Sequence, residues 1–265
     1  MNIKLSLSLL ALENFFELEK FLSILKKNRI KYVELPISKI LPKYKINKKK
    51  IKFFLKTLNK YKIKVSSVQA IYYGKNLNVL NSAQFKKNFD HLKQIITISK
   101  LLKVNNIIFG SPLNRKKNNL SLVQSNKNFQ RLLSKIDNIL SKNKIYFLIE
   151  PNSKHYKCDY LINSNEVLNF IKKNNFKNIF INLDTGNALL ENDKILINKR
   201  DKQYFKNFQI SEKNLLGLSN NKEKHKKILR KFILKNKFIS LEMLNIDINK
   251  LDKNIKKFKI ITKII

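Results

Sequence analysis

Short apolar runs of strand length recur along the chain at regular intervals, and polar segments separate them. The three clearest runs cover residues 145–149, 179–183 and 238–241, and they are rich in isoleucine, leucine and phenylalanine. Such runs are typical of strands that are buried on both faces, as in a parallel sheet. A carboxylate follows each run: Glu150, Asp184 and Glu242. Because an unpaired buried carboxylate is costly, we expect the three acids at the mouth of a sheet.

The remaining pattern predicts further strands and a helix after most of them. The other strands are expected at residues 3–8, 32–35, 64–70, 106–109 and 208–211. Apolar positions spaced three and four apart predict amphipathic helices between them, at residues 15–25, 47–61, 85–96, 126–140, 164–171, 222–234 and 248–264. Ser164 is the expected N-cap of the fifth of these helices.

Eight strands alternating with helices, without a linker or a repeat, predict a (β/α)₈ TIM barrel. The length of 265 residues suits this fold, and we expect one domain over residues 1–265. A doubly wound open sheet is the competing architecture. The segment after the first strand lacks a glycine-rich phosphate loop, which disfavours the dinucleotide-binding form of that sheet.

The net charge of +38 raises the question of nucleic-acid binding. Only five residues are arginine, the side chain best suited to reading phosphates and guanine edges. Lysine is instead spread evenly over every segment, as expected of solvated helix faces. We therefore expect no specific nucleic-acid partner.

Cysteine and hydropathy patterns point to a cytoplasmic protein. Cys158 is the one cysteine, so a disulfide framework and a thiolate metal cluster are excluded. The apolar start from Met1 to Leu12 lacks the basic region and cleavage site of a signal peptide. No run approaches the roughly 18 apolar residues of a membrane span, so no membrane partner is expected.

In a TIM barrel, functional groups gather at the C-terminal ends of the strands. Glu150, Asp184 and Glu242 occupy such positions, and Gln209 falls within the predicted strand between the last two acids. The intervals of 34, 25 and 33 residues each match about one strand–helix unit. Three converging carboxylates would repel one another unless a divalent cation neutralised them. Oxygen ligands suit Mg²⁺ or Mn²⁺ better than Zn²⁺.

The histidines contribute less to this picture. His91 and His225 lie within predicted helices and are interpreted as surface residues. His155 follows the fifth strand and could reach the mouth, although exposure in a loop is the simpler interpretation. Cys158 is interpreted as a small side chain without chemistry.

Five short motifs resemble the sugar phosphate isomerase/epimerase family of the xylose isomerase-like barrel superfamily. They are found in the family's order and span most of the chain, at residues 33–35, 149–152, 182–187, 209–212 and 240–243. The resemblance implies that Glu150, Asp184 and Glu242 bind a divalent metal, Mn²⁺ or Mg²⁺ first, with Co²⁺ or Zn²⁺ as alternatives. It also implies that Glu150 and Glu242 exchange protons with a substrate carbon.

Two positions depart from the family pattern. The family's fourth metal ligand is a histidine where this chain has Gln209, and a substrate-binding histidine is replaced by Asn187. An amide oxygen is a weaker ligand than imidazole for transition metals. Gln209 either completes the metal site or only forms hydrogen bonds near the mouth. Asn187 and Gln69, near the end of the third strand, are the expected substrate-binding residues.

The leading functional hypothesis is a metal-dependent isomerase or epimerase of a small sugar, sugar phosphate or keto-polyol, acting through an enediolate. A keto-polyol dehydratase shares the first step. An endonuclease IV-like enzyme would need several histidines for three zinc ions, and the chain has three histidines in all. A non-catalytic barrel is the third alternative. The expected partner is a small carbohydrate, and a homodimer is an open option.

Overall fold

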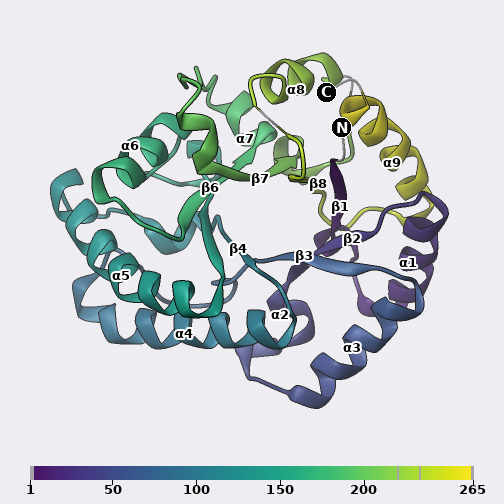
Figure 1. Cartoon of the computed structure of the whole chain (residues 1–265), viewed down its shortest axis with the longest axis horizontal. Coiled ribbons are helices and arrows are strands. Elements are labelled where there is room, and N and C mark those ends of the chain that lie inside the picture. Colours follow the sequence, from purple (N-terminus) through teal and green to yellow (C-terminus); the bar gives the residue numbers. More distant parts are fainter. Residues whose placement is uncertain (1–2, 220, 233, 264–265) are drawn as a thin grey trace.

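The computed structural model describes residues 3–219, 221–232 and 234–263, and its centre is a closed barrel of parallel strands (Figure 1). The strands are β1 (Lys4–Ser8), β2 (Tyr32–Pro36), β3 (Lys64–Gln69), β4 (Asn106–Phe109), β5 (Tyr146–Ile149), β6 (Ile179–Asp184), β7 (Phe205–Ile210) and β8 (Phe238–Leu241). Each strand pairs with the next, and β1 closes the barrel by pairing with β8. The predicted (β/α)₈ fold is confirmed, and the open-sheet alternative is wrong because β1 and β8 have no free edge.

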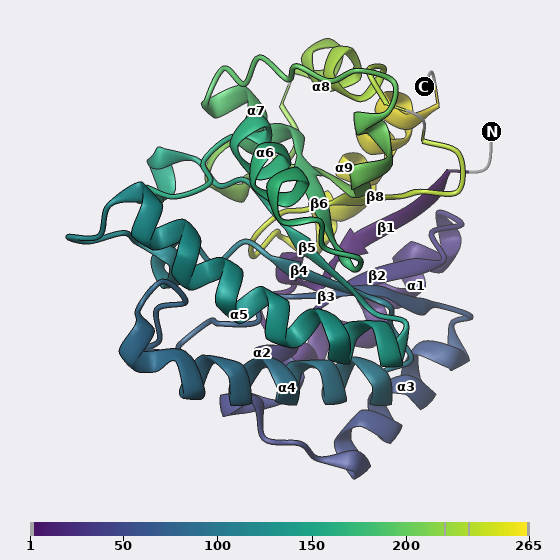
Figure 2. The same ribbon diagram turned by 60° about the vertical axis from the view of Figure 1, so that its left-hand side comes forward.

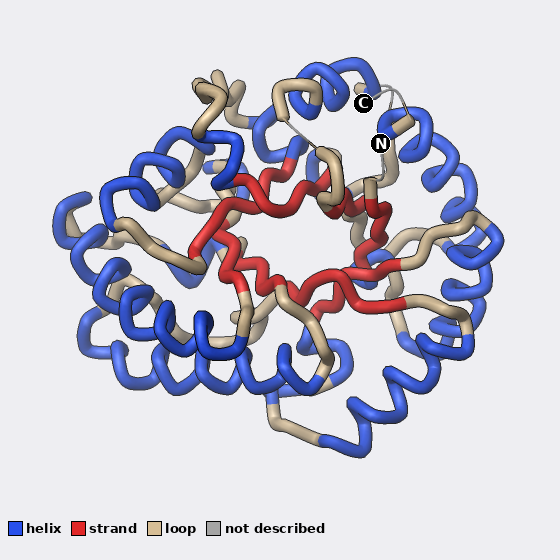
Figure 3. Tube along the Cα trace, viewed as in Figure 1, coloured by secondary structure: helices blue, strands red, loops and turns tan. Residues whose placement is uncertain are grey.

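Helices surround the strands on the outside, as the blue and red tubes of Figure 3 show. They are α1 (Leu18–Lys27), α2 (Ile37–Ile40), α3 (Lys48–Lys60), α4 (Phe85–Leu101), α5 (Leu122–Asn143), α6 (Ser164–Asn174), α7 (Thr185–Leu190), α8 (Lys222–Leu229) and α9 (Ile248–Thr262). The two long helices α4 and α5 lie side by side along one flank (Figure 2). In the described parts of the chain, no helix combines the length and the apolarity needed to cross a bilayer.

The two faces of the barrel strands differ in chemistry. Alternate residues of a strand point to opposite faces, so each strand divides its side chains between the helices and the barrel interior. The helix-facing residues form the main apolar core, with members such as Leu7, Val33, Leu35, Phe109, Phe147, Ile149, Ile181, Leu183, Phe208, Ile210, Ile239 and Leu241. The interior residues of β1, β2, β3, β6, β7 and β8 are polar, among them Ser6, Ser8, Glu34, Ser67, Gln69, Asn182, Asp184, Asn207, Gln209 and Ser240. The barrel interior is therefore largely hydrogen-bonded.

Several helices end on a residue in the left-handed backbone region, which glycine favours. Lys144 ends α5 with a φ of 54°, and its N–H donates to the carbonyl oxygens of Leu140 and Ser141. Asn175 ends α6 with a φ of 50°. Arg29, Lys62 and Lys103 adopt the same region two residues beyond the ends of α1, α3 and α4. A chain with four glycines thus uses lysine, arginine and asparagine at these turns.

Sequence patterning located most elements within a few residues, with some corrections. Asn163, rather than Ser164, is the N-cap of α6, because its side-chain oxygen accepts the N–H of Glu166. The short helices α2 and α7 were missed, since neither spans two turns of periodic pattern. β7 begins at Phe205 and not at Phe208. Ile233 and Ile264, which belong to the predicted helices 222–234 and 248–264, lie outside the described residues.

Candidate functional site

A cavity of about 230 Å³ opens at the C-terminal ends of the barrel strands, and we call it the mouth cavity. Its lining includes all three predicted carboxylates, Glu150, Asp184 and Glu242, which follow or end β5, β6 and β8. The other polar side chains of its lining include Gln69, Asn152, Tyr156 and Asn187. The structure therefore brings together the acids and both expected substrate-binding residues.

Glu150 is buried at the end of β5, and amide groups surround its carboxylate. Its Oε1 accepts from Asn152 Nδ2 at 3.0 Å and from Asn187 Nδ2 at 3.3 Å. Its Oε2 accepts from Asn182 Nδ2 at 3.0 Å. The backbone is fixed as well, because Arg115 Nη2 donates to the Glu150 carbonyl oxygen at 2.6 Å. These contacts hold the carboxylate against the wall of the cavity.

Asp184 is held where β6 turns into α7. Its Oδ1 accepts the N–H of Gly186 at 2.6 Å and thereby caps the helix. The Ser211 hydroxyl lies 2.8 Å from Oδ1 and 2.7 Å from Oδ2. A Cβ at Gly186 would collide with the Ser211 hydroxyl and carbonyl oxygens. Glycine at this position therefore lets Ser211 approach Asp184.

Glu242 lies across the cavity at the end of β8. It is buried, and its N–H donates to the Ile210 carbonyl oxygen at 3.0 Å, which continues the pairing of β7 with β8. The nearby Gln69 side chain opposes the effect of this burial and lowers the pKa of Glu242. Glu242 therefore lines the same cavity as Glu150.

Burial and mutual repulsion perturb the ionisation of all three acids. Burial, followed by the charge of Asp184, raises the pKa of Glu150 to about 8, although Arg115 acts in the opposite direction. Burial, then the charges of Glu150 and Asp184, raise the pKa of Glu242 well above its ordinary value. Burial also raises the pKa of Asp184, opposed by its hydrogen bonds to Ser211 and Gly186. Such clustered, desolvated acids are typical of functional sites and attract a cation.

Gln209 points into the barrel beneath the cavity and is fully buried. Its Nε2 donates to Glu34 Oε2 at 2.8 Å and to Gln69 Oε1 at 3.3 Å. Its Oε1 accepts a hydrogen bond from Asn182 Nδ2. Gln209 is not among the residues that line the mouth cavity. The Gln209 amide oxygen, which we considered as a metal ligand from the sequence, therefore already accepts a hydrogen bond from Asn182.

Glu34 and Arg115 lie beside this site and were not predicted as site residues, although residues 33–35 formed one of the five motifs. Glu34 is fully buried in β2, and burial raises its pKa, opposed by hydrogen bonds first from Gln209. An acid between Val33 and Leu35 in an apolar strand was the available signal. Arg115 is fully buried, with its guanidinium 5.6 Å from the centre of the Phe109 ring. Arg115 gave no signal, because it lies in a polar loop.

Two histidines were wrongly placed on the surface. His91 is buried on α4 between the rings of Tyr44 and Tyr72, and its Nε2 lies 2.6 Å from the Ile71 carbonyl oxygen. His225 is buried on α8, with Nδ1 2.8 Å from the Thr185 hydroxyl. Each lies on the barrel-facing side of its helix, which lysine-rich surroundings obscured. The expected exposure of His155 is confirmed.

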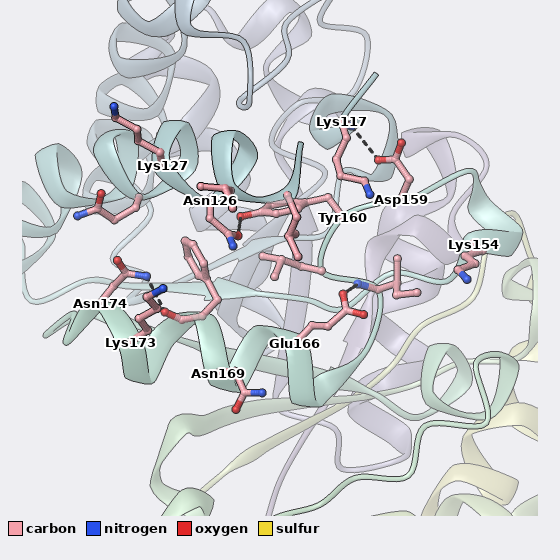
Figure 4. A pocket seen from close by; sticks show the side chains of 16 residues that line it. Lys117, Asn126, Lys127, Lys154, Asp159, Tyr160, Glu166, Asn169, Lys173 and Asn174 are labelled. Carbon is pink, nitrogen blue, oxygen red and sulfur yellow. Dashed lines mark hydrogen bonds between the residues drawn. The ribbon is translucent and has the colours of Figure 1, made fainter. Parts of the chain in front are cut away.

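A larger cavity lies elsewhere, between α5 and α6 (Figure 4). It measures about 720 Å³, and its two acids are tied to backbone groups. Asp159 accepts the N–H of Lys117 at 2.8 Å, and Glu166 accepts the N–H of Ile162 at 2.9 Å. Because no reactive groups converge there, the mouth cavity is the better candidate for a catalytic site despite its smaller size.

The donor set of the mouth cavity fits a hard divalent cation in its chemistry. Its three carboxylates offer oxygen atoms only, which Mg²⁺ and Mn²⁺ prefer. Within residues 3–219, 221–232 and 234–263, no three acidic, histidine or cysteine side chains form a ready-made coordination group. A cation would therefore draw the carboxylates from their present amide partners toward a common point.

Proteins of known structure that share this fold are described as different kinds of enzyme. Three of them are an AP endonuclease, family 2, from Brucella melitensis (TM-score 0.73, 14% identity, covering 92% of this chain and 94% of that one), a D-psicose 3-epimerase in the presence of D-fructose (0.72, 14%, 97% and 90%), and the probable 3-DHS dehydratase AsbF from Bacillus anthracis (0.72, 15%, 97% and 99%). Identities this low show the fold alone. A search of curated proteins gave no match.

The family model described as the xylose isomerase-like TIM barrel matches residues 22–247. This range contains every barrel strand after β1 and all three carboxylates of the mouth cavity. The expectation drawn from the five motifs is thereby confirmed: the chain belongs to the xylose isomerase-like TIM barrel family.

Proposed function

We propose that the chain is a metal-dependent isomerase or epimerase of a small sugar, sugar phosphate or keto-polyol. The observation that carries the proposal is the position of Glu150 and Glu242, two buried carboxyl groups that line one cavity from different strands. A ketose between them would have an acid–base group on each side. The epimerase and dehydratase among the structures of the same fold support a sugar-modifying reaction.

The glutamates would move a proton to and from the carbon next to the carbonyl group. A general acid or base works best when its pKa is close to the operating pH. Burial and the nearby Asp184 bring the pKa of Glu150 toward that range, and that of Glu242 is raised for the same reasons. One glutamate would abstract a proton at its carboxylate oxygen, and the other would return a proton to the opposite face.

Glu150, Asp184 and Glu242 would hold Mn²⁺ or Mg²⁺, with Co²⁺ or Zn²⁺ as less suited alternatives. When bound, the metal would polarise the carbonyl group and stabilise the negative charge of an enediolate. Asn187 and Gln69 line the cavity and would orient the substrate hydroxyl groups. Arg115 would hold the backbone of Glu150 in place through its 2.6 Å hydrogen bond.

The other candidate functions have less support from the site. A dehydratase would use the same glutamates and differs only in the loss of water after enolisation. An endonuclease IV-like enzyme would need a histidine-rich zinc site, and none of the three histidines lines the mouth cavity. A non-catalytic barrel would explain the substitutions at Gln209 and Asn187. A cytoplasmic location and a homodimer stay predictions.

The decisive experiment is a metal-content measurement on protein purified without chelator, combined with a screen for solvent-deuterium incorporation. The panel would include ketoses, their phosphates and keto-polyols. Incorporation into one of them that depends on metal and disappears in Glu150→Gln supports the proposal. No incorporation into any compound at any metal loading, in a correctly folded protein, would favour the non-catalytic barrel.

A further inference from the structure

Four side chains inside the barrel form a closed ring of hydrogen bonds, which we call the amide ring: Glu34, Asn207, Asn182 and Gln209. Asn207 Nδ2 donates to Glu34 Oε1 at 3.2 Å and to Asn182 Oδ1 at 2.7 Å. Asn182 Nδ2 donates to Gln209 Oε1, and Gln209 Nε2 donates to Glu34 Oε2 at 2.8 Å. All four residues are fully buried. Because bulk water does not reach them, their polar atoms must find partners within the protein, and all do so except Asn207 Oδ1, which has no partner among the described residues.

The strand register explains why these residues meet. Asn182 on β6 is paired with Asn207 on β7, and the pair Asp184–Gln209 follows two residues later. Glu34 on β2 reaches the same level from the opposite wall, where Ser67 Oγ donates to its Oε1 at 2.9 Å. The ring therefore crosses the barrel just beneath the mouth cavity.

The amide ring has a fixed direction because its members differ in donors and acceptors. An amide donates through nitrogen and accepts through oxygen, whereas both carboxylate oxygens accept. Glu34 accepts from both of its ring neighbours, so Asn207 and Gln209 must each turn their nitrogen toward it. The Gln209 oxygen then points toward Asn182, and the Asn182 side-chain nitrogen donates a hydrogen bond to it.

The ring extends to both glutamates of the mouth cavity. Asn182 Nδ2, which donates to Gln209, also donates to Glu150 Oε2 at 3.0 Å. On the other side, Gln209 Nε2 donates to Gln69 Oε1 at 3.3 Å. The Gln69 nitrogen thereby donates to the Ser8 hydroxyl, and the Gln69 side chain lowers the pKa of the neighbouring Glu242. Glu150 consequently receives an amide N–H from Asn182, and the Gln69 amide has its oxygen bound by Gln209 and a second N–H free to turn toward the Glu242 side of the cavity.

We propose that Gln209 is a positioning residue, anchored by Glu34, and that it does not bind the metal. Its role is to orient the amide groups of Asn182 and Gln69 toward the two glutamates. Three observations carry the inference: the Gln209 oxygen already has a partner, its side chain does not line the mouth cavity, and its nitrogen donates in both directions. The inference rests on the proposed function only in treating the two glutamates as the reacting groups.

The first test replaces Glu34 by glutamine. An amide at position 34 would accept from only one ring neighbour, so Asn207 or Gln209 would lose its partner or reverse. We expect the side-chain amide signals of Asn182 and Gln69 to shift or broaden in ¹⁵N-labelled, metal-free Glu34→Gln. Ser6→Ala is the control, because Ser6 is buried in the same barrel but bonds only to Ser66. Unchanged amide signals in Glu34→Gln would overturn the inference.

The second test exchanges the two groups in the double variant Glu34→Gln/Gln209→Glu. The new amide at position 34 can donate to the new carboxylate at position 209, which still accepts from Asn182. Position 209 no longer has an N–H for Gln69. We therefore expect the Asn182 signal to return to its wild-type position while the Gln69 signal stays shifted. A role that concerns only stability does not predict this selective rescue, and rescue of neither signal would contradict the proposed direction.

The third test titrates Mn²⁺ alone and Zn²⁺ alone by calorimetry. If Gln209 is a ligand, Gln209→His should tighten Zn²⁺ binding and Glu34→Gln should leave Mn²⁺ binding unchanged. If Gln209 is a positioning residue, Gln209→His should not tighten the binding of either metal. Gln209→Ala and Glu34→Gln should each weaken Mn²⁺ binding by about tenfold, as is typical when a hydrogen-bond partner of a metal ligand is removed. Tighter Zn²⁺ binding by Gln209→His with unchanged Mn²⁺ binding by Glu34→Gln would overturn the inference.

The failures of the two proposals are distinguishable. If wild-type protein incorporates no deuterium into any ketose while the amide signals respond as expected, the proposed function fails and the amide ring stands. If wild-type protein exchanges protons and the Glu34→Gln amide signals do not move, the positioning role fails and the proposed function stands.

Discussion

The outer face of the barrel strands packs against the helices through apolar side chains, whereas the inner face is linked by hydrogen bonds. On the outer face, residues such as Leu183 and Phe208 pack against the helices, and each fully buried side chain of this kind stabilises the fold by about 1.5–3 kcal/mol. On the inner face, their sequence neighbours Asn182 and Gln209 are equally buried but form directional hydrogen bonds. Hydrogen bonds contribute less net stability than apolar burial, but they specify one arrangement. Along one strand, the outward-facing residues thus stabilise the fold, and the inward-facing residues between them shape the site.

The inner face is itself uneven. Ile108 on β4 and Leu148 on β5 are buried, yet they stand apart from the helix-facing core. β6, β7 and β8 instead contribute amides, a serine and carboxylates to the interior. The apolar wall at β4 and β5 lowers the local polarity around Glu150, which contributes to the burial that raises its pKa.

Removing the inner carboxylates should have the largest effect on activity. We expect Glu150→Gln and Glu242→Gln each to lower the rate of solvent-deuterium exchange by about 10³-fold, since general acid–base groups contribute 10²–10⁴-fold. Circular dichroism should show an intact fold. Exchange at the wild-type rate in either variant would remove that residue from the mechanism.

Truncating an outer residue should have the opposite signature. The centre of the Phe208 ring lies 5.2 Å from the centre of the Phe232 ring. Phe208→Ala removes this ring and should lower the free energy of unfolding by about 3–5 kcal/mol. Urea denaturation measures this change. The protein that remains folded should exchange deuterium at a near-normal rate. A loss of exchange as large as that expected for Glu150→Gln would contradict the division between the two faces.

The pH dependence of stability should follow the raised acid pKa values. Between about pH 4.5 and about pH 8, folded Glu150 binds more protons than the unfolded chain, because burial raises its folded pKa. Stability of the metal-free protein should therefore fall as pH rises through this range, and Glu242 acts in the same direction. Thermal melts at pH 5, 6.5 and 8 test this, with Glu150→Gln as the control that should reduce the slope and leave the part due to Glu242.

A smaller effect is expected where α7 begins. Gly186→Ala would push Ser211 away from Asp184, and we expect it to lower the free energy of unfolding by about 1–3 kcal/mol. Because Asp184 would lose its hydroxyl partner, Mn²⁺ binding should weaken as well. Gly74→Ala is a useful contrast: Gly74 has a φ of 70°, but a Cβ there meets no atom, so only backbone strain should appear.

The smallest effect is expected for nucleic acids. The dispersed lysines should bind DNA or RNA without sequence preference, through release of counterions alone. Fluorescence anisotropy at 50 and 200 mM salt should show the affinity collapse as salt rises. Tight, sequence-selective binding at the higher concentration would revive the endonuclease interpretation.

The positions of the three carboxylates were predictable because the signal is local. A strand ends, an acid follows, and the barrel fold places all such ends on one face. The amide ring was not predictable, because Glu34 and Gln209 are 175 residues apart and meet only through the register of the closed barrel. His225 was misplaced for a related reason: the lysines around it concealed that its side of α8 is buried.

The non-glycine residues that end the helices have a consequence for how the protein tolerates mutation. Left-handed backbone costs about 1–2 kcal/mol at residues such as Lys103 and Lys144, and Arg29 and Lys62 carry the same cost. Their sum is comparable with the total stability of many domains. Each such cost is subtracted from the net free energy of unfolding, and in a marginally stable protein a change of about 1–2 kcal/mol is enough to alter abundance in the cell. Each of these helix ends is also a site where a single change to glycine would restore part of that free energy.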